Sequence, residues 1–132
     1  EAAWSGIDPK QILLAGYINA DIHLPMKPIT FLGDSLEALR AFPHEARRES
    51  GLQLDRVQRG LMPDNWKPMK TIGAGVTEIR VRVEGGAFRV LYVATFPEAV
   101  YVLHAFQKKT QKTAKADLSL ATTRYKALRK ER

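Results

Sequence analysis

The stretch VTEIRVRVEGGAFRVLYVATFPEAVYVLHAF, residues 76–106, decides the fold. Apolar and polar residues alternate in much of it with a period of two, which is typical of β-strands with one buried face. Gly85-Gly86 and Pro97-Glu98 interrupt the apolar runs, and such pairs are typical of tight turns between strands. The stretch therefore predicts three antiparallel strands, at about residues 76–84, 87–96 and 99–107.

A two-residue turn at Gly85-Gly86 predicts that Arg82 lies opposite Arg89. One face of the sheet is then apolar and forms the core that the helices cover; it carries Val81, Val83, Phe88, Val90, Tyr92, Leu103 and Ala105. The second hairpin places Leu91 opposite His104 on the other face, which carries Glu78, Arg80, Arg82, Arg89, Leu91, His104 and Phe106. Because like charges opposite each other are unfavourable, this second face is a candidate anion-binding surface.

The flanking residues predict an α+β protein. A short strand at about 28–32 precedes a helical hairpin that begins at Asp34 or Ser35, and residues 60–75 read as a loop because of their glycines and prolines. A basic helix begins at about Lys115. The expected architecture is an N-terminal strand and helical hairpin, a three-stranded antiparallel meander and a C-terminal helix, in a single domain over residues 26–132.

Residues 1–25 have no evident part in this domain. Asp8-Pro9 could begin a short helix there, with Asp8 as the N-cap. The segment is interpreted as an extension of unclear role, either an upstream remnant or a docking arm.

The charge is concentrated at one end of the chain. The net charge is +7, and residues 108–132 carry all of it, with nine Lys/Arg against Asp117 and Glu131. Such a cluster is typical of a phosphate-binding surface, although a solvated basic tail has the same composition. The absence of cysteine excludes disulfides and thiolate catalysis. No apolar run reaches the length of a membrane span and no signal peptide is evident, so no membrane association and a cytoplasmic location are expected.

The segments KPITFLGDSLEALRAFP (27–43), PDNWKPMKTIGAGVTEIRV (63–81), FRVLYVA (88–94) and HAFQKKTQKT (104–113), in this order, resemble the phage-derived HigB-like toxins of the RelE/ParE superfamily. The resemblance implies a RelE-like fold and a toxin of a type II toxin–antitoxin system. It further implies an mRNA-cleaving endoribonuclease that acts on translating ribosomes, inhibits translation and is blocked by a cognate antitoxin with a helix-turn-helix domain.

The resemblance also implies site residues. Arg89 matches the arginine that such toxins direct at the scissile phosphate, and Arg80 and Lys109 match two further basic positions. Cleavage by the RNA's own 2′-OH requires proton transfer as well as cationic stabilisation of the transition state. His104 is the favoured proton-transfer group, with Glu78 or a lysine as alternatives. The expected RNA-binding residues are Arg82, Lys108, Lys112 and Lys115.

No metal or other cofactor is expected, because HEARRE at 44–49 lacks the HExxH spacing of a zinc site. Two other functions fit the sequence. A ParE-like toxin would inhibit DNA gyrase through protein contacts, and a non-enzymatic basic module would bind nucleic acid with residues 108–132.

Overall fold

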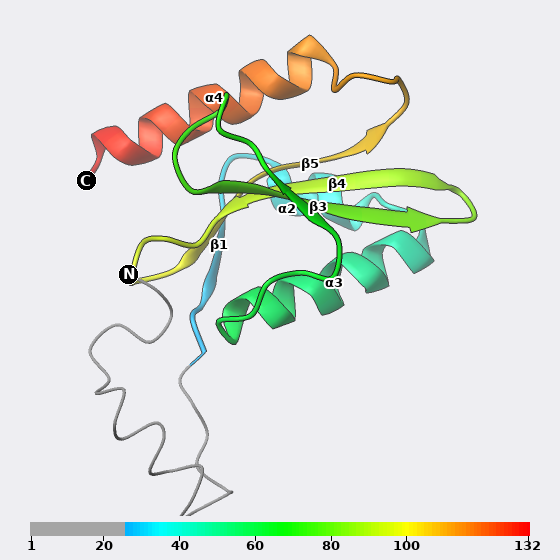
Figure 1. The fold of residues 1–132 in the computed structure, drawn as a ribbon, viewed down its shortest axis with the longest axis horizontal. Coiled ribbons are helices and arrows are strands. Elements are labelled where there is room, and N and C mark those ends of the chain that lie inside the picture. The colour runs from blue at the N-terminus through cyan, green and yellow to red at the C-terminus, as the bar shows by residue number, and fades with distance from the viewer. Residues whose placement is uncertain (1–25) are drawn as a thin grey trace, which may run out of the picture.

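The computed structural model describes residues 26–132. Its elements are β1 (Ile29–Phe31), α2 (Ser35–Arg40), α3 (His44–Gln58), β2 (Trp66–Pro68), β3 (Val76–Val83), β4 (Gly86–Val93), β5 (Val100–Lys108) and α4 (Lys115–Lys130). This is the expected α+β architecture of the RelE type, with the helical hairpin, the meander and the C-terminal helix in place (Figure 1). The helix expected near Asp8 lies outside the described residues.

The sheet has five strands in the order β1-β5-β4-β3-β2. The strand expected at 28–32 is present as β1, which pairs in parallel with β5. The prediction of a continuous loop over 60–75 is wrong, because Trp66–Pro68 forms an edge strand antiparallel to β3. A strand of three residues that ends in a proline is too short to show a period of two in the sequence.

The first hairpin has a different register from the expected one. Glu84 and Gly85 form the turn and Val83 pairs with Gly86, which has a φ of 134° that glycine adopts readily. The expected pairing of Arg82 with Arg89 is therefore wrong, and Arg89 lies opposite Arg80 instead. The register is shifted by two residues, so each side chain stays on the face where it was expected. The alternation of apolar and polar residues excludes a shift of one residue, because every side chain would then change face. It is equally compatible with a shift of two residues, which changes no face.

The second hairpin follows the prediction up to a β-bulge. Leu91 pairs with His104 as expected, but Tyr92 then pairs with Val102, so Leu103 has no opposite residue. A bulge inserts an extra residue and changes the face on which the following side chains lie. The expectation that Leu103 belongs to the face of the helical hairpin is consequently wrong, because Leu103 packs in the core beneath α4.

The sheet has a core on each face. Helices α2 and α3 cover one face, where Leu39, Phe42 and Leu54 pack against Val81, Phe88 and Val90. Helix α4 lies across the opposite face (Figure 1), and Ala121, Tyr125 and Leu128 pack against Leu91, Leu103 and Phe106. The prediction that the helices cover a single face is wrong for α4. The apolar residues of α4 must be buried, as those of α3 are. Leu91 and Phe106 provide an apolar surface for them on the face that also carries the charged strand residues.

No helix within residues 26–132 is both long enough and apolar enough to cross a lipid bilayer.

Candidate functional site

Two hollows lie on the α4 side of the sheet, at the end of β5. The arginine hollow has a volume of about 400 Å³ and is lined by Arg82, Ala87, Arg89, Lys108, Lys109, Thr110 and Gln111. The β2 hollow has a volume of about 320 Å³ and is lined by Lys67, Met69, Thr71, Glu78, Arg80, Lys108, Gln111, Lys112, Thr113 and Leu118. Because Lys108 and Gln111 line both, the hollows adjoin, and we call them together the basic groove.

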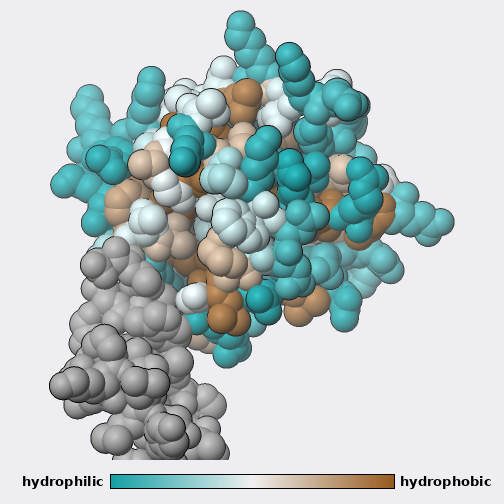
Figure 2. Space-filling model, viewed as in Figure 1, coloured by the Kyte–Doolittle hydropathy of each residue, from teal (hydrophilic) through white to brown (hydrophobic). Residues whose placement is uncertain are grey.

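Cations dominate the lining of the basic groove. Among the residues that the structure describes, seven lysines and arginines line it, against the single carboxylate of Glu78; they are Lys67, Arg80, Arg82, Arg89, Lys108, Lys109 and Lys112. A concave wall of one sign of charge concentrates field lines and attracts ligands of the opposite sign. Figure 2 shows that hydrophilic side chains cover most of the surface seen in that view, with apolar ones in small separate areas.

Glu78 holds two of the arginines in place. Its Oε1 accepts a hydrogen bond from Arg80 Nε at 3.2 Å and lies 3.7 Å from Arg89 Nε. Glu78 is 2% exposed, and a carboxylate this buried requires a cationic partner. One carboxylate between two arginines leaves a positive excess that an anion in the groove would balance.

Arg89 is the most buried cation of the groove, at 9% exposed. Its Nη1 donates to the Phe88 carbonyl at 3.0 Å, which fixes the guanidinium beside its own strand. Burial lowers the pKa of Arg89 from its ordinary value; Glu78 raises that pKa, and Arg80 and Arg82 lower it. Arginine nevertheless stays protonated in proteins, so Arg89 is a permanently charged donor held in a defined orientation.

Six of the eight residues predicted from the sequence meet in the basic groove: Arg80, Arg82, Arg89, Lys108, Lys109 and Lys112. His104 and Lys115 are not among its lining residues. Lys115 is exposed at the first position of α4. The sequence interpretation missed Lys67 and Gln111. Lys67, on β2, lies opposite Glu78, and no pattern in the sequence predicted that strand.

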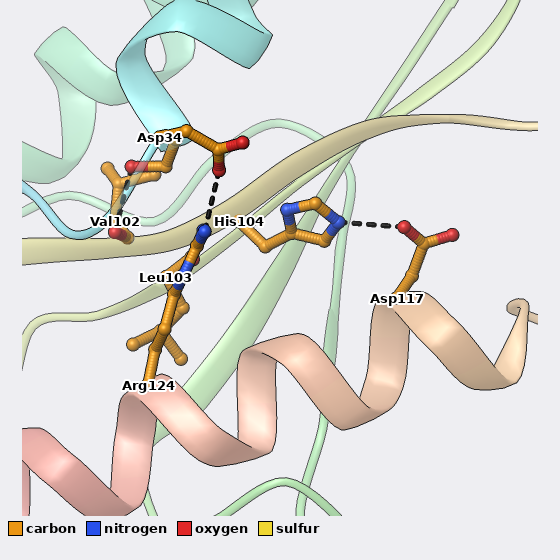
Figure 3. A network of polar contacts seen from close by, with 7 residues as sticks. Asp34, Val102, Leu103, His104, Asp117 and Arg124 are labelled. Carbon is orange, nitrogen blue, oxygen red and sulfur yellow. Dashed lines mark hydrogen bonds and ion pairs between the residues drawn. The ribbon is translucent and has the colours of Figure 1, made fainter.

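His104 lies beneath α4 rather than in the groove. Its Nε2 is 2.7 Å from Asp117 Oδ1, and its ring stacks on Phe106 with centroids 5.2 Å apart. His104 is 8% exposed, and its Nδ1 has no hydrogen-bond partner among residues 26–132. The contact with Asp117 fixes the first turn of α4 against β5 (Figure 3).

A second polar contact fixes α4 two turns further along. Arg124 donates to Asp34 at 2.6 Å and to the carbonyl of Leu103 at 2.9 Å (Figure 3). The bulge removes Leu103 from the regular ladder, and Arg124 satisfies its carbonyl. The hydrogen bond from Arg124 is the main cause that lowers the pKa of Asp34. Together the two contacts set the position of α4, and therefore of the 109–114 connection that carries Lys109 and Lys112.

Comparison with known proteins places the chain in a family. Residues 37–126, more than half of the chain, match the family model "Phage derived protein Gp49-like (DUF891)". No curated protein matches the chain. The matched region begins in α2 and ends in α4, so it includes every residue that lines the basic groove. The chain therefore belongs to the Gp49-like family of phage-derived proteins, toxins of toxin–antitoxin systems within the RelE/HigB-like superfamily.

Proposed function

We propose that the protein is an endoribonuclease toxin that cleaves mRNA, acts on ribosome-bound message and thereby inhibits translation. The observation that carries the proposal is the basic groove, in which seven cations and one carboxylate surround space for a phosphate chain. As a toxin of a toxin–antitoxin family, the chain has a cognate antitoxin, which we propose carries a helix-turn-helix domain. We place the toxin domain at residues 26–132, with residues 1–25 as an extension.

In the proposed reaction, the 2′-OH of one nucleotide attacks the adjoining phosphorus while the bond from phosphorus to the 5′-oxygen breaks. The products are a 2′,3′-cyclic phosphate and a 5′-OH end. Two negatively charged oxygens develop on phosphorus, and permanent donors aimed at them stabilise the transition state. Arg89 is the proposed principal donor, since guanidinium binds phosphate oxygens in pairs. Arg80 and Lys109 act beside it, and Arg82, Lys108, Lys112 and Lys115 hold the flanking phosphates.

The reaction also moves one proton from the 2′-OH and another to the 5′-oxygen. His104 is the group that the sequence favours, but it is 8% exposed beneath α4 and is not among the residues that line the groove. We therefore assign proton transfer to Lys108 or Lys109, which line the same hollow as Arg89.

The test is to map the 5′ ends of cellular mRNA after induction of the chain alone and together with its antitoxin. New ends inside coding regions that disappear with the antitoxin support the proposal. Intact mRNA together with double-strand breaks in DNA contradicts it and indicates inhibition of gyrase. A version that lacks residues 1–25 should produce the same ends if the toxin domain begins at residue 26.

A further inference from the structure

The two halves of the basic groove differ in chemistry. Within residues 26–132, the arginine hollow has basic and polar walls with Ala87 as its only apolar residue, whereas Met69 and Leu118 both line the β2 hollow. A volume of about 320 Å³ is at the lower end of the range for small-ligand pockets, about 300 to 1,000 Å³. A phosphate group gains nothing from contact with apolar side chains, so the β2 hollow suits a ligand that has an apolar face as well as a polar group.

Glu78 gives the β2 hollow an acceptor. Its contacts with Arg80 and Arg89 all fall on Oε1 within the described part of the chain. A carboxylate carries lone pairs on both oxygens, so Oε2 can accept a hydrogen bond from a ligand. The hollow therefore combines two apolar side chains with one buried acceptor.

A nucleobase has the matching properties. Its faces are flat and apolar and contact thioethers and aliphatic side chains favourably, and carboxylates accept hydrogen bonds from exocyclic amino groups. The two hollows adjoin at Lys108 and Gln111. In RNA each phosphate is likewise next to a nucleoside, so one hollow can hold the phosphate and the other its neighbouring base. We propose that the β2 hollow binds the nucleobase next to the phosphate in the arginine hollow and prefers a base with an amino group. The inference rests on the proposed function, since it takes RNA as the ligand.

The test is a binding measurement that requires no cleavage. Fluorescein-labelled pentanucleotides of 2′-O-methyl residues cannot be cleaved, and their affinity for the full chain is measured by fluorescence anisotropy at fixed salt. Each oligonucleotide is compared with versions in which one internal base is removed. At one position the loss of the base should weaken binding about tenfold, as expected for loss of one bound base. Equal affinities at every position would overturn the proposal and leave the β2 hollow as a phosphate site.

Variants of α4 provide a matched comparison. Leu118→Ala shortens a wall of the β2 hollow and should remove most of the difference between intact and abasic oligonucleotides. Leu120→Ala makes the same change at a residue that is 36% exposed and does not line the groove, and the difference should remain. A loss in both variants, or in neither, would contradict the assignment of the hollow.

The role of Glu78 is tested by the identity of the base. Adenine, cytosine and guanine carry amino groups and should bind severalfold more tightly at this position than uracil, and Glu78→Leu, which has no acceptor, should abolish that order. Equal binding of uracil and cytosine by the wild-type chain would overturn the preference for an amino group. If the oligonucleotides bind with these preferences but induced cells show intact mRNA, the nuclease proposal fails and the base site stands. If mRNA is cleaved but binding shows no dependence on the base, the base site fails and the nuclease proposal stands.

Discussion

Arg80 and Arg89 lie directly opposite each other on β3 and β4, and Oε1 of Glu78 contacts the Nε of both. Two like charges in one cross-strand pair are unfavourable, and a single carboxylate compensates for only one of them. One positive charge of the pair therefore remains uncompensated and attracts a second anion, which in the proposed function is the scissile phosphate.

The first prediction concerns Arg89. Arg89→Ala should lower cleavage of a ribosome-bound message by about a hundredfold or more, because it removes a fixed donor to the transition state. RNA binding should change little, since the other cations of the groove remain. Cleavage is measured by primer extension, and growth arrest is followed in parallel.

Arg48→Ala is the control for Arg89, because Arg48 is exposed on α3 and its removal changes the net charge equally. It should cleave like the wild type. An Arg89→Ala variant that melts normally and remains fully toxic would show that the basic groove is not the active site.

The second prediction concerns salt. Simultaneous replacement of Lys108, Lys109 and Lys112 by Gln should flatten the dependence of RNA affinity on salt. Each phosphate contact releases counterions, so three lost contacts should reduce the logarithmic slope by about 2 on a single strand. The slope is obtained from anisotropy titrations at several salt concentrations.

Replacement of Arg47, Arg48 and Arg59 by Gln removes the same charge from exposed positions on and just after α3 and should leave the slope nearly unchanged. Equal slopes for the two triple variants would show that Lys108, Lys109 and Lys112 do not contact phosphates and belong to an ordinary solvated loop.

The third prediction concerns the contact between His104 and Asp117. His104→Ala and Asp117→Ala should each lower the free energy of unfolding by about 1.5 to 3 kcal/mol, the usual contribution of a hydrogen bond to a charged group. Both should also reduce cleavage, and by similar factors, because the contact holds the first turn of α4 beside the groove. Thermal melts and primer extension give the two quantities.

Thr123→Ala, at an exposed position of α4, should have little effect on either. If His104→Ala alone abolished cleavage while Asp117→Ala cleaved normally, the ring itself would be the proton-transfer group.

The fourth prediction concerns alkaline pH. Burial raises the pKa of Tyr92 to about 12 from 10.0, against a smaller lowering by Thr77. Because the pKa of Tyr92 is higher in the folded state, burial of the neutral phenol contributes fully to the free energy of unfolding below pH 10. That contribution is lost as the pH rises towards 12. A shift of this size corresponds to roughly 2 to 3 kcal/mol.

Tyr92→Phe has no phenol to ionise, so its free energy of unfolding should fall less steeply over the same range. Urea titrations of both proteins at pH 9 and pH 11.5 measure the difference between them. A difference that does not change with pH would contradict the buried position of the phenol.

The fifth prediction concerns the packing of α4 on the loop before β3. A Cβ added at Gly73 would lie 2.1 Å from the Tyr125 ring, so Gly73→Ala should destabilise the fold by about 1 to 3 kcal/mol. Gly51→Ala meets no atom within 4 Å in the interior of α3 and should stabilise it by about 0.5 to 1 kcal/mol. Melting curves should therefore shift in opposite directions, and a shift in the same direction would contradict the contact.

The sequence predicted the meander and the face of each charged strand residue correctly, because these depend on the alternation of side chains. It did not predict the pairing of Arg80 with Arg89, since a two-residue shift preserves the alternation. Nor did it predict the bulge at Leu103, which depends on how the carbonyl of Leu103 is satisfied by Arg124, distant in the sequence.

The composition of the groove was partly predictable. Residues on one face of neighbouring strands, such as Arg80 and Arg89, follow from the meander alone. The separation of His104 from them was not predictable, because it depends on Asp117 and hence on which face α4 covers. Lys67 entered the groove through β2, a strand too short to leave a pattern.

The position of β5 in the sheet has a consequence for synthesis on the ribosome. β5 is the last strand to be translated, yet it lies between β1 and β4, and Ile29 pairs with Val100 across 71 positions of sequence. The early strand β1 and the β3–β4 hairpin therefore have no shared partner until β5 leaves the exit tunnel, and such distant pairings form slowly. Lys109 and Lys112 of the groove and helix α4 follow later still. Until β5 and the residues that follow it have left the ribosome, the nascent chain therefore lacks a complete sheet and, with it, a complete basic groove.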